Sequence, residues 1–170
     1  MKKTIFIILG IILIDQLTKG YILSLLVRGW PLVGEHAALV PYPFLMTRVT
    51  SWFNIVFTWN PGTAFSMFRS LPAISLIFLT GAIIGYLSYM LFFQIKDKTE
   101  RLAMTFIVGG ALGNLVDRIR FGAVIDFIDW HVKGFHWPSF NIADIFISLG
   151  VALYILHFIM QRKKANGSIS

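Results

Sequence analysis

The sequence predicts an all-α membrane protein with four transmembrane helices, built as a single membrane domain over residues 1–170. Two observations support this fold class. Of the 170 residues, 56% are hydrophobic and only 14% are charged, and the mean hydropathy of +0.74 is higher than that of an ordinary water-soluble domain. The chain also contains four apolar runs, each long enough for the roughly 20 helical residues that cross a hydrocarbon core.

The first apolar run covers residues 5–27 and follows Met-Lys-Lys, a beginning that also occurs in secretory signal peptides. Because the apolar sequence continues to Val27 without a convincing small-x-small cleavage site, we expect a retained helix that Asp15 and Lys19 interrupt. The other three spans are predicted over residues 71–93, 102–119 and 140–160.

The positions of lysine and arginine predict the orientation of these helices. If the chain crosses the membrane four times, the basic clusters at residues 2–3, 96–101 and 162–164 all fall on one side. Short cytoplasmic segments carry the excess of Lys and Arg, so this side is predicted to be cytoplasmic. Both termini are then cytoplasmic.

The two outer segments are predicted over residues 28–70 and 120–139. Tryptophan favours the membrane interface, so these segments are expected to lie on the outer membrane surface. Residues 51–59 are rich in aromatic and β-branched side chains and are bounded by turn formers, which predicts a short strand or hairpin. Together the outer segments contain all five tryptophans: Trp30, Trp52, Trp59, Trp130 and Trp137.

Two glycine pairs lie within the predicted spans at GxxxG spacing. They are Gly81 with Gly85 and Gly109 with Gly113. This spacing permits the close approach of a neighbouring helix, either within one bundle or between two copies of the chain.

Several functional classes find no support in the sequence. The net charge of +7 is not gathered on one segment, so no nucleic-acid partner is expected. There is no cysteine for a disulfide or a thiolate metal site, and no Gly-x-Ser-x-Gly or Walker-type motif is present. No metal site is predicted from the histidines, which lack HExxH or comparable spacing: His36, His131, His136 and His157.

Ionisable and amide side chains in the spans are the first candidates for a site, because charges at membrane depth are costly and have partners or functions. Asp15 and Lys19 share one helix face, either as an ion pair that fixes packing or as part of a polar site. Gly110, Asn114 and Asp117 form a polar stripe near the outer end of the third span. With Arg118, Asp117 is expected to support the following loop rather than to react.

Two further carboxylates, on different segments, are expected at the outer face. Asp126 follows the third span in the apolar setting Gly122-Ala-Val-Ile-Asp126-Phe127. With Pro138 and Ser139 marking the start of the fourth helix, a rise of 1.5 Å per residue predicts Asp144 roughly 7 to 8 Å along it. Spacing alone does not separate Asp126 from Asp129 as the side chain that faces inward.

If two such carboxylates meet, desolvation and like-charge repulsion favour a pair that holds one shared proton. One can then act as a general base on water while the protonated one polarises an amide, which is metal-free peptide hydrolysis. The alternatives are a proton-coupled transporter and a non-catalytic assembly factor. A transporter would spread relay acids such as Asp15, Asp117, Asp126 and Asp144 through membrane depth, and an assembly factor would survive loss of either aspartate.

Five sequence blocks follow one another along the chain. They are Asp15-Gln-Leu-Thr-Lys19, Asn60-Pro-Gly-Thr-Ala-Phe65, Gly109-Gly-Ala-Leu-Gly-Asn114-Leu-Val-Asp117-Arg118, Val124-Ile-Asp126-Phe127 and Phe140-Asn141-Ile-Ala-Asp144. Taken together and in this order, they resemble the lipoprotein signal peptidase family (signal peptidase II, or prolipoprotein signal peptidase), and the similarity extends from Asp15 to the end of the fourth span.

The resemblance implies an aspartic endopeptidase of the bacterial inner membrane that removes the signal peptide of prolipoproteins, cutting before a diacylglyceryl-modified cysteine. It implies a four-helix bundle with a small periplasmic β-cradle and an outer amphipathic segment. The expected partners are lipid-modified prolipoproteins and membrane lipid, with no cofactor and no obligate protein partner.

The same resemblance assigns roles to individual residues. It selects Asp126 over Asp129 as the catalytic partner of Asp144. Residues expected to line, orient or support the site are Asn60, Gly62, Gly110, Asn114, Arg118, Asn141, Asp15, Lys19 and Asp117. Pro61 and Thr63 depart from the commoner family pattern, and because proline has no amide hydrogen, no backbone donor is expected at position 61.

Overall fold

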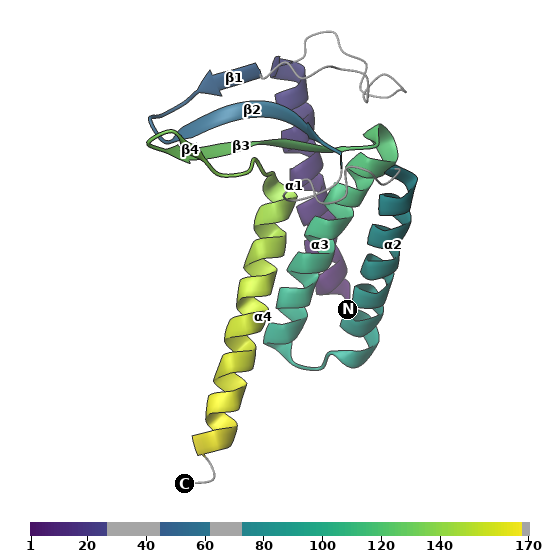
Figure 1. Ribbon diagram of the computed structural model, residues 1–170. Helices are drawn as coiled ribbons and strands as arrows, with labels where there is room; N and C mark the ends of the chain where they lie inside the picture. The colour runs from purple at the N-terminus through teal and green to yellow at the C-terminus, as the bar shows by residue number, and fades with distance from the viewer. Residues whose placement is uncertain (27–44, 62–72, 168–170) are drawn as a thin grey trace.

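A computed structural model of the chain describes residues 1–26, 45–61 and 73–167 (Figure 1). Gly62 and residues 28–44 and 63–70 of the first predicted outer segment lie outside the described residues. The outer amphipathic segment stays a prediction. The helices are α1 (Lys2–Leu26), α2 (Ala73–Tyr89), the π-helical turn η3 (Met90–Gln94), α3 (Lys98–Phe121) and α4 (Ile142–Gly167). The strands are β1 (Leu45–Arg48), β2 (Phe53–Asn60), β3 (Val124–Val132) and β4 (Phe135–His136).

Four helices in the described part of the chain are long and apolar enough to cross a membrane. Their qualifying stretches are Lys2–Ser24, Ile74–Gln94, Lys98–Phe121 and Ile142–Lys163. Large apolar side chains point outward from them; Phe6, for example, is 72% exposed. Such a surface suits contact with lipid, because the helices satisfy their own backbone hydrogen bonds.

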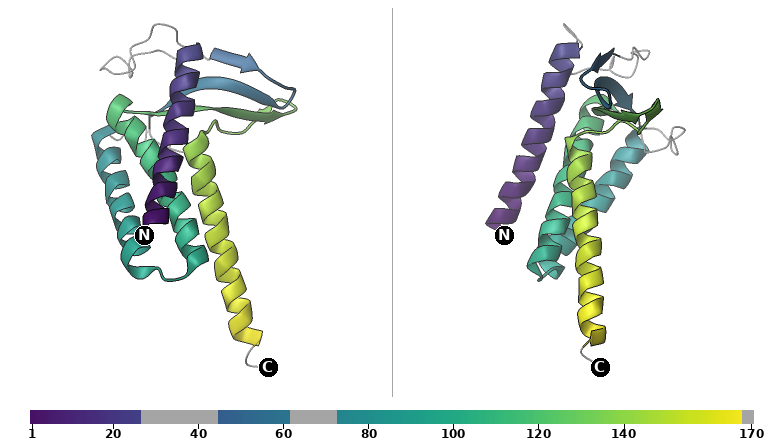
Figure 2. Two further views of the ribbon diagram at one scale, coloured as in Figure 1. Left: turned by 180° about the vertical axis from the view of Figure 1, so that it is seen from behind. Right: turned by 90° about the vertical axis from the view of Figure 1, so that its left-hand side faces the viewer.

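Helix α3 lies at the centre of the bundle and packs against α1, α2 and α4. The sheet lies across one end of the bundle, and the start of α1 and the end of α4 both point to the opposite end (Figures 1 and 2). An apolar cluster of Ile8, Leu91, Ile95, Met104 and Val108 fills the half of the bundle away from the sheet. The polar candidates therefore concentrate at the sheet end.

The ends of α3 are defined by local signals. At its start, the side chain of Asp97 accepts hydrogen bonds from the backbone N–H groups of Thr99 at 2.8 Å and Glu100 at 3.0 Å. At its end, Gly122 adopts the left-handed conformation with φ of 72° and donates its N–H to the carbonyl of Arg118. This turn leads the chain directly into β3.

The sheet is antiparallel in the order β1-β2-β3-β4. Strand β2 lies over the segment where the sequence predicts a strand, whereas β3 was not expected from its sequence. The register between β2 and β3 shifts between Ile55 and Thr58, where two residues of β2 oppose the single Phe127 of β3. This bulge separates the ladder around Asp129 from the ladder around Asp126, and bulges of this kind redirect side chains.

The two GxxxG pairs differ in their surroundings. A β-carbon on Gly109 would contact Ile11 of α1, and one on Gly113 would lie 2.8 Å from Oδ2 of Asp15. Among the described residues, nothing lies within 4 Å of a β-carbon built on Gly81 or Gly85. Only the second pair therefore serves close helix packing in this part of the molecule.

Candidate active site

Asp126 is the third residue of β3 and lies at the sheet end of the bundle, where it is 2% exposed. Both of its carboxylate oxygens accept hydrogen bonds from amide side chains. Asn141 donates Nδ2 to Oδ1 at 2.7 Å, and Asn60 of β2 donates Nδ2 to Oδ2 at 3.0 Å. Asp126 is therefore held from two sides by uncharged donors.

Asp144 is the third residue of α4 and is partly buried. The oxygen Oδ1 of Asn141 accepts from the backbone N–H of Asp144 at 3.0 Å, and Oδ2 of Asp144 accepts from the backbone N–H of Asn141 at 3.3 Å. This reciprocal pair is a capping box. It fixes the orientation of the Asp144 side chain at the start of the helix.

The expectation that Asp144 lies roughly 7 to 8 Å along the fourth helix is wrong, because α4 begins at Ile142 and Asp144 is only about 3 Å from its start. The residue before the cap explains the difference. Phe140 pairs with β3 by accepting from the N–H groups of Phe127 and Ile128 and donating to the carbonyl of Ile128. The backbone therefore stays extended through Phe140, and Asn141 begins the helix instead of Ser139.

Two amide side chains connect the carboxylates of Asp126 and Asp144. Asn141, which binds Asp126, also donates Nδ2 to Oδ1 of Asn114 at 3.1 Å. Asn114 of α3 in turn donates its Nδ2 to Oδ1 of Asp144 at 2.7 Å. The two acids, from β3 and from α4, thus share one hydrogen-bonded network.

A buried ion cluster contacts this network at Asn114. Lys19 Nζ lies 2.8 Å from Asp15 Oδ2, 2.9 Å from Asp117 Oδ2 and 3.0 Å from Asn114 Oδ1. Lys19, Asp15 and Asp117 are each at most 1% exposed. Lys19 therefore neutralises two buried acids and holds Asn114 in place.

The two acids of this cluster also bind backbone groups of the elements that carry the candidate dyad. Asp15 Oδ1 accepts from the N–H of Ala143 in α4 at 2.9 Å, and Asp117 Oδ2 accepts from the N–H of Ile125 in β3 at 3.1 Å. These contacts position the residues next to Asp144 and Asp126. Asp15 and Lys19 were expected either to form an ion pair that only fixes packing or to take part in a polar site. The geometry favours the second hypothesis, because their ion pair contacts the polar network.

Gln16 was not selected from the sequence as a site residue. It donates Nε2 to Asp117 Oδ1 at 2.8 Å and to the carbonyl of Gly113 at 3.2 Å. The available signal was its position next to Asp15 and three residues before Lys19, which places Gln16 and Lys19 on neighbouring turns of the helix.

Arg118 and Gly110 lie beside the network without belonging to its hydrogen-bond chain. Within the described residues, the buried Nε of Arg118 has no hydrogen-bond partner, and its guanidinium interacts electrostatically with Asp144 and Asp126. A β-carbon on Gly110 would collide with the carbonyl oxygen of Ala143. Gly110 thereby allows the first turn of α4 to approach α3.

Asp129 takes no part in this network. Its carboxylate accepts from Asn54 Nδ2 at 2.7 Å and lies 2.9 Å from Nδ1 of His136. The geometry thus separates the two rivals on β3: Asp126 joins the network that contains Asp144, and Asp129 joins a separate polar group on the β3–β4 hairpin.

The environment of Asp126 changes its acidity. Burial raises the pKa of its carboxyl group to about 7, and the nearby charge of Asp144 acts in the same direction. The hydrogen bonds from Asn60 and Asn141 act in the opposite direction, because they stabilise the carboxylate. A carboxyl group that titrates near neutral pH, beside a second acid, is suited to proton transfer.

Comparison with known proteins identifies the family. Residues 7–160 match the family model described as signal peptidase (SPase) II. Three relatives named lipoprotein signal peptidase come from Thermodesulfovibrio yellowstonii, Janthinobacterium sp. and Syntrophus aciditrophicus. They are 38%, 40% and 36% identical, over 91%, 85% and 96% of this chain and 93%, 81% and 99% of their own lengths.

Solved structures agree with this match. The fold resembles a bacterial membrane enzyme solved by the in meso method at 2.3 Å, with a TM-score of 0.76 and 26% identity over 96% of this chain and 92% of the other. A second such enzyme, solved at 1.9 Å, gives a TM-score of 0.71 and 26% identity over 93% of each chain. The chain therefore belongs to the signal peptidase II family and is a multi-pass membrane peptidase.

Proposed function

We propose that this chain is an aspartic endopeptidase that removes the signal peptide of bacterial prolipoproteins, cutting on the N-terminal side of the diacylglyceryl-modified cysteine. The observation that carries the proposal is the amide network through Asn114 and Asn141, which joins Asp126 to Asp144. In a member of the signal peptidase II family, this pair is the best candidate for a catalytic dyad.

In the proposed reaction the two acids share one proton. Asp126, which is more buried and has the raised pKa, holds that proton and donates it to the carbonyl oxygen of the scissile amide. Asp144 removes a proton from water, whose oxygen attacks the carbonyl carbon. Collapse of the resulting diol, with proton transfer to the amide nitrogen, releases the signal peptide as a carboxylate and leaves a free amine on the cysteine.

The place of the dyad suits a lipid-bearing substrate. Asp144 lies at the sheet end of a helix that can span the membrane, and Asp126 lies on the adjoining strand. We propose that this end faces the periplasm and that both termini lie in the cytoplasm, in the inner membrane. The signal helix then enters from lipid, and water reaches the dyad from the periplasm. A lipid-free soluble peptide should therefore be a poor competitor; turnover equal to that of the lipidated substrate would contradict this lateral entry.

The surrounding residues support the dyad in two ways. We propose that Asn60, Asn114 and Asn141 orient the two carboxylates, while the guanidinium of Arg118 stabilises negative charge that develops nearby. The residues Asp15, Lys19, Asp117 and Gly110 hold α1, α3, β3 and α4 together around them.

The test compares cleavage of a purified diacylglyceryl-modified prolipoprotein by wild type, Asp126→Asn and Asp144→Asn in detergent. Both variants should fold, because asparagine is nearly isosteric with aspartate, and both should lose activity by at least about 1,000-fold. Mass spectrometry should show the wild-type product beginning at the lipidated cysteine.

Asp97→Asn is the matched control, because asparagine also caps helices and Asp97 starts α3 at the opposite end of the bundle. It should cut at the wild-type rate. Near-wild-type activity of Asp126→Asn together with an inactive Asp129→Asn would show that the dyad is wrongly assigned. Survival of activity in both single dyad variants would exclude an aspartic mechanism through these residues.

A further inference from the structure

We propose that the β3–β4 hairpin carries a second site, separate from the dyad, in which Asp129, His131 and His136 bind a divalent metal ion of the zinc class. One potential ligand atom from each of the three side chains lies within 4.8 Å of the others. Two imidazole nitrogens and one carboxylate oxygen form a donor set that suits zinc and neighbouring late transition metals.

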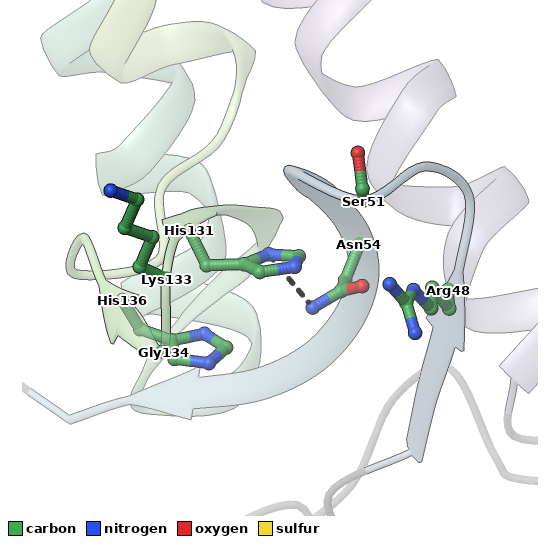
Figure 3. Close-up of a pocket in the computed structure, with 7 residues that line it drawn as sticks. All are labelled: Arg48, Ser51, Asn54, His131, Lys133, Gly134 and His136. Atoms are coloured by element: carbon green, nitrogen blue, oxygen red, sulfur yellow. Dashed lines mark hydrogen bonds between the residues drawn. The ribbon is translucent and has the colours of Figure 1, made fainter.

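Strand geometry brings these three side chains together. Asp129 and His131 are two residues apart on β3, so they project from the same face of the strand. His136 of β4 is the antiparallel partner of His131 in the register of the hairpin. The imidazole rings stack with centroids 4.9 Å apart and an interplanar angle of 15° (Figure 3).

The separations are close to those that a bound ion requires. Zinc binds nitrogen and oxygen at about 2.1 Å in tetrahedral sites, which places neighbouring ligand atoms about 3.4 Å apart. Here Nδ1 of His136 lies 2.9 Å from Asp129 Oδ1, and Nδ1 of His131 lies 3.7 Å from Asp129 Oδ2. An ion between the three atoms would require the side chains to rotate and would replace the contact of Asn54 Nδ2 with Nδ1 of His131 at 3.2 Å.

Asp129 is already oriented as a metal-binding carboxylate would be. It is 4% exposed, and Asn54 of β2 donates Nδ2 to its Oδ2 at 2.7 Å. Hydrogen bonds of this kind to ligating side chains orient them and are a regular part of metal sites. The hydrogen bond between His136 and Asp129 would be replaced when an ion enters, because Nδ1 must lose its proton to bind metal.

A fourth ligand can reach the ion from an adjoining pocket. This pocket has a volume of about 400 Å³, and His131 and His136 form part of its wall together with Asn54, Arg48 and Lys133 (Figure 3). Water can therefore complete the coordination. The positive charges of Arg48 and Lys133 favour a small anion, such as a carboxylate, as an additional ligand.

The hairpin provides a rigid frame for the site. Its two-residue turn consists of Lys133 and Gly134, both with positive φ values of 50° and 84°, which corresponds to a type I′ geometry. An ion would join β4 to β3, and Asn54 would connect both to β2. The expected role is therefore to stabilise the edge of the sheet, not to react with the substrate at Asp126.

The experiment measures zinc binding to the full chain in detergent, purified through a tag that contains no histidine. Zinc retained after equilibrium dialysis against zinc-buffered solutions is measured by elemental mass spectrometry. Wild type should bind one equivalent, and His131→Ala and His136→Ala should each weaken zinc binding by at least about 100-fold. His157→Ala and His36→Ala are matched controls that remove the other two histidines, and they should bind as wild type does.

The visible absorption of bound Co²⁺ supplies a second measurement, which reports the coordination of the metal directly. Wild type loaded with Co²⁺ should show the visible absorption of a four-coordinate N/O site, and His136→Gln, at the more exposed ligand, should lose it while retaining peptidase activity and its melting temperature. Absence of stoichiometric zinc binding by wild type would overturn the proposal. Zinc affinity that both hairpin variants retain would overturn it as well, and neither result depends on the assignment of the dyad.

Discussion

The Nδ2 atom of Asn141 lies 2.7 Å from Oδ1 of Asp126, and the Oδ1 atom of the same side chain caps the helix that begins with Ile142. One residue thus performs two tasks. It sets the start of α4, which positions Asp144, and it donates a hydrogen bond to the other acid of the proposed dyad. These tasks can be separated by substitution.

Asn141→Ser should retain helix capping but cleave the substrate more slowly. Serine caps helices about as well as asparagine, but it is too short and lacks the amide that reaches Asp126. Losing a hydrogen bond to a charged group corresponds to roughly 1.5–3 kcal/mol, or about 10- to 100-fold in kcat. The measurement is kcat on a lipidated substrate together with the melting temperature.

Asn141→Ala serves as the comparison, because alanine removes both tasks. It should lose a similar amount of activity and, in addition, about 0.5–2 kcal/mol of stability from the missing cap. Full activity of Asn141→Ser would contradict the role of the amide at Asp126.

The rate of cleavage should fall as the pH rises above neutral. Burial raises the pKa of Asp126 to about 7, so the shared proton is present below that pH and is lost above it. If the protonated carboxyl is needed, kcat/KM should decrease about tenfold per pH unit on the alkaline side. The measurement is a pH–rate profile under conditions in which the chain stays folded.

Asn60→Ala should shift this alkaline limb in a defined direction. Asn60 donates to Asp126 and lowers its pKa by stabilising the carboxylate, so removing this donor should raise the pKa of Asp126. The limb should then move to higher pH while its slope stays the same. A shift to lower pH would mean that Asn60 does not act on Asp126 in this way.

Lys19→Met should destabilise the whole bundle. The substitution preserves most of the side-chain volume but leaves Asp15 and Asp117 buried without their cation. Breaking a buried pair in this way costs about 3–5 kcal/mol. Unfolding by denaturant titration in mixed micelles measures the change.

Lys163→Met is the control for the loss of one positive charge from a helix. Lys163 is exposed near the end of α4, so its substitution should change stability by no more than about 0.5 kcal/mol. Equal effects of the two lysine variants would show that the cluster around Lys19 does not stabilise the fold.

The bundle was predictable from the sequence because lipid imposes a simple rule: each apolar run of about 20 residues forms a helix. The strand β3 was not predictable in the same way. Residues 124–132 carry two acids among apolar side chains, and their pairing depends on Phe140 and on β2, which is distant in the sequence. The residue pattern around Ser51 to Trp59, by contrast, showed β2 directly.

The candidate site could be predicted from the sequence only in part, for the same reason. The resemblance to the family selected Asp126 over Asp129, while spacing alone left both open. Asp126 and Asp129 are three residues apart on β3 and therefore project from opposite faces of the strand. Which of these faces meets the bundle depends on the pairing with β2 and is not visible in either strand alone. The proximity of His131 and His136 likewise depends on the turn at Lys133 and Gly134, not on a metal-binding motif.

Gly110→Ala tests whether the approach of α3 to α4 positions Asp144. The added methyl group would collide with the carbonyl oxygen of Ala143 and lie 2.8 Å from Cγ1 of Ile147, so the first turn of α4 must move away. Overpacking of this kind costs about 1–3 kcal/mol, and a displacement of about 1 Å at a reacting group can reduce the rate about 100-fold. Gly81→Ala makes the same chemical change where the described structure leaves open space, and it should alter neither the rate nor the melting temperature appreciably. The measurements are the cleavage rate and the melting temperature of both variants. If Gly110→Ala were as active as Gly81→Ala, the approach of α3 to α4 at Gly110 would not be needed to position Asp144.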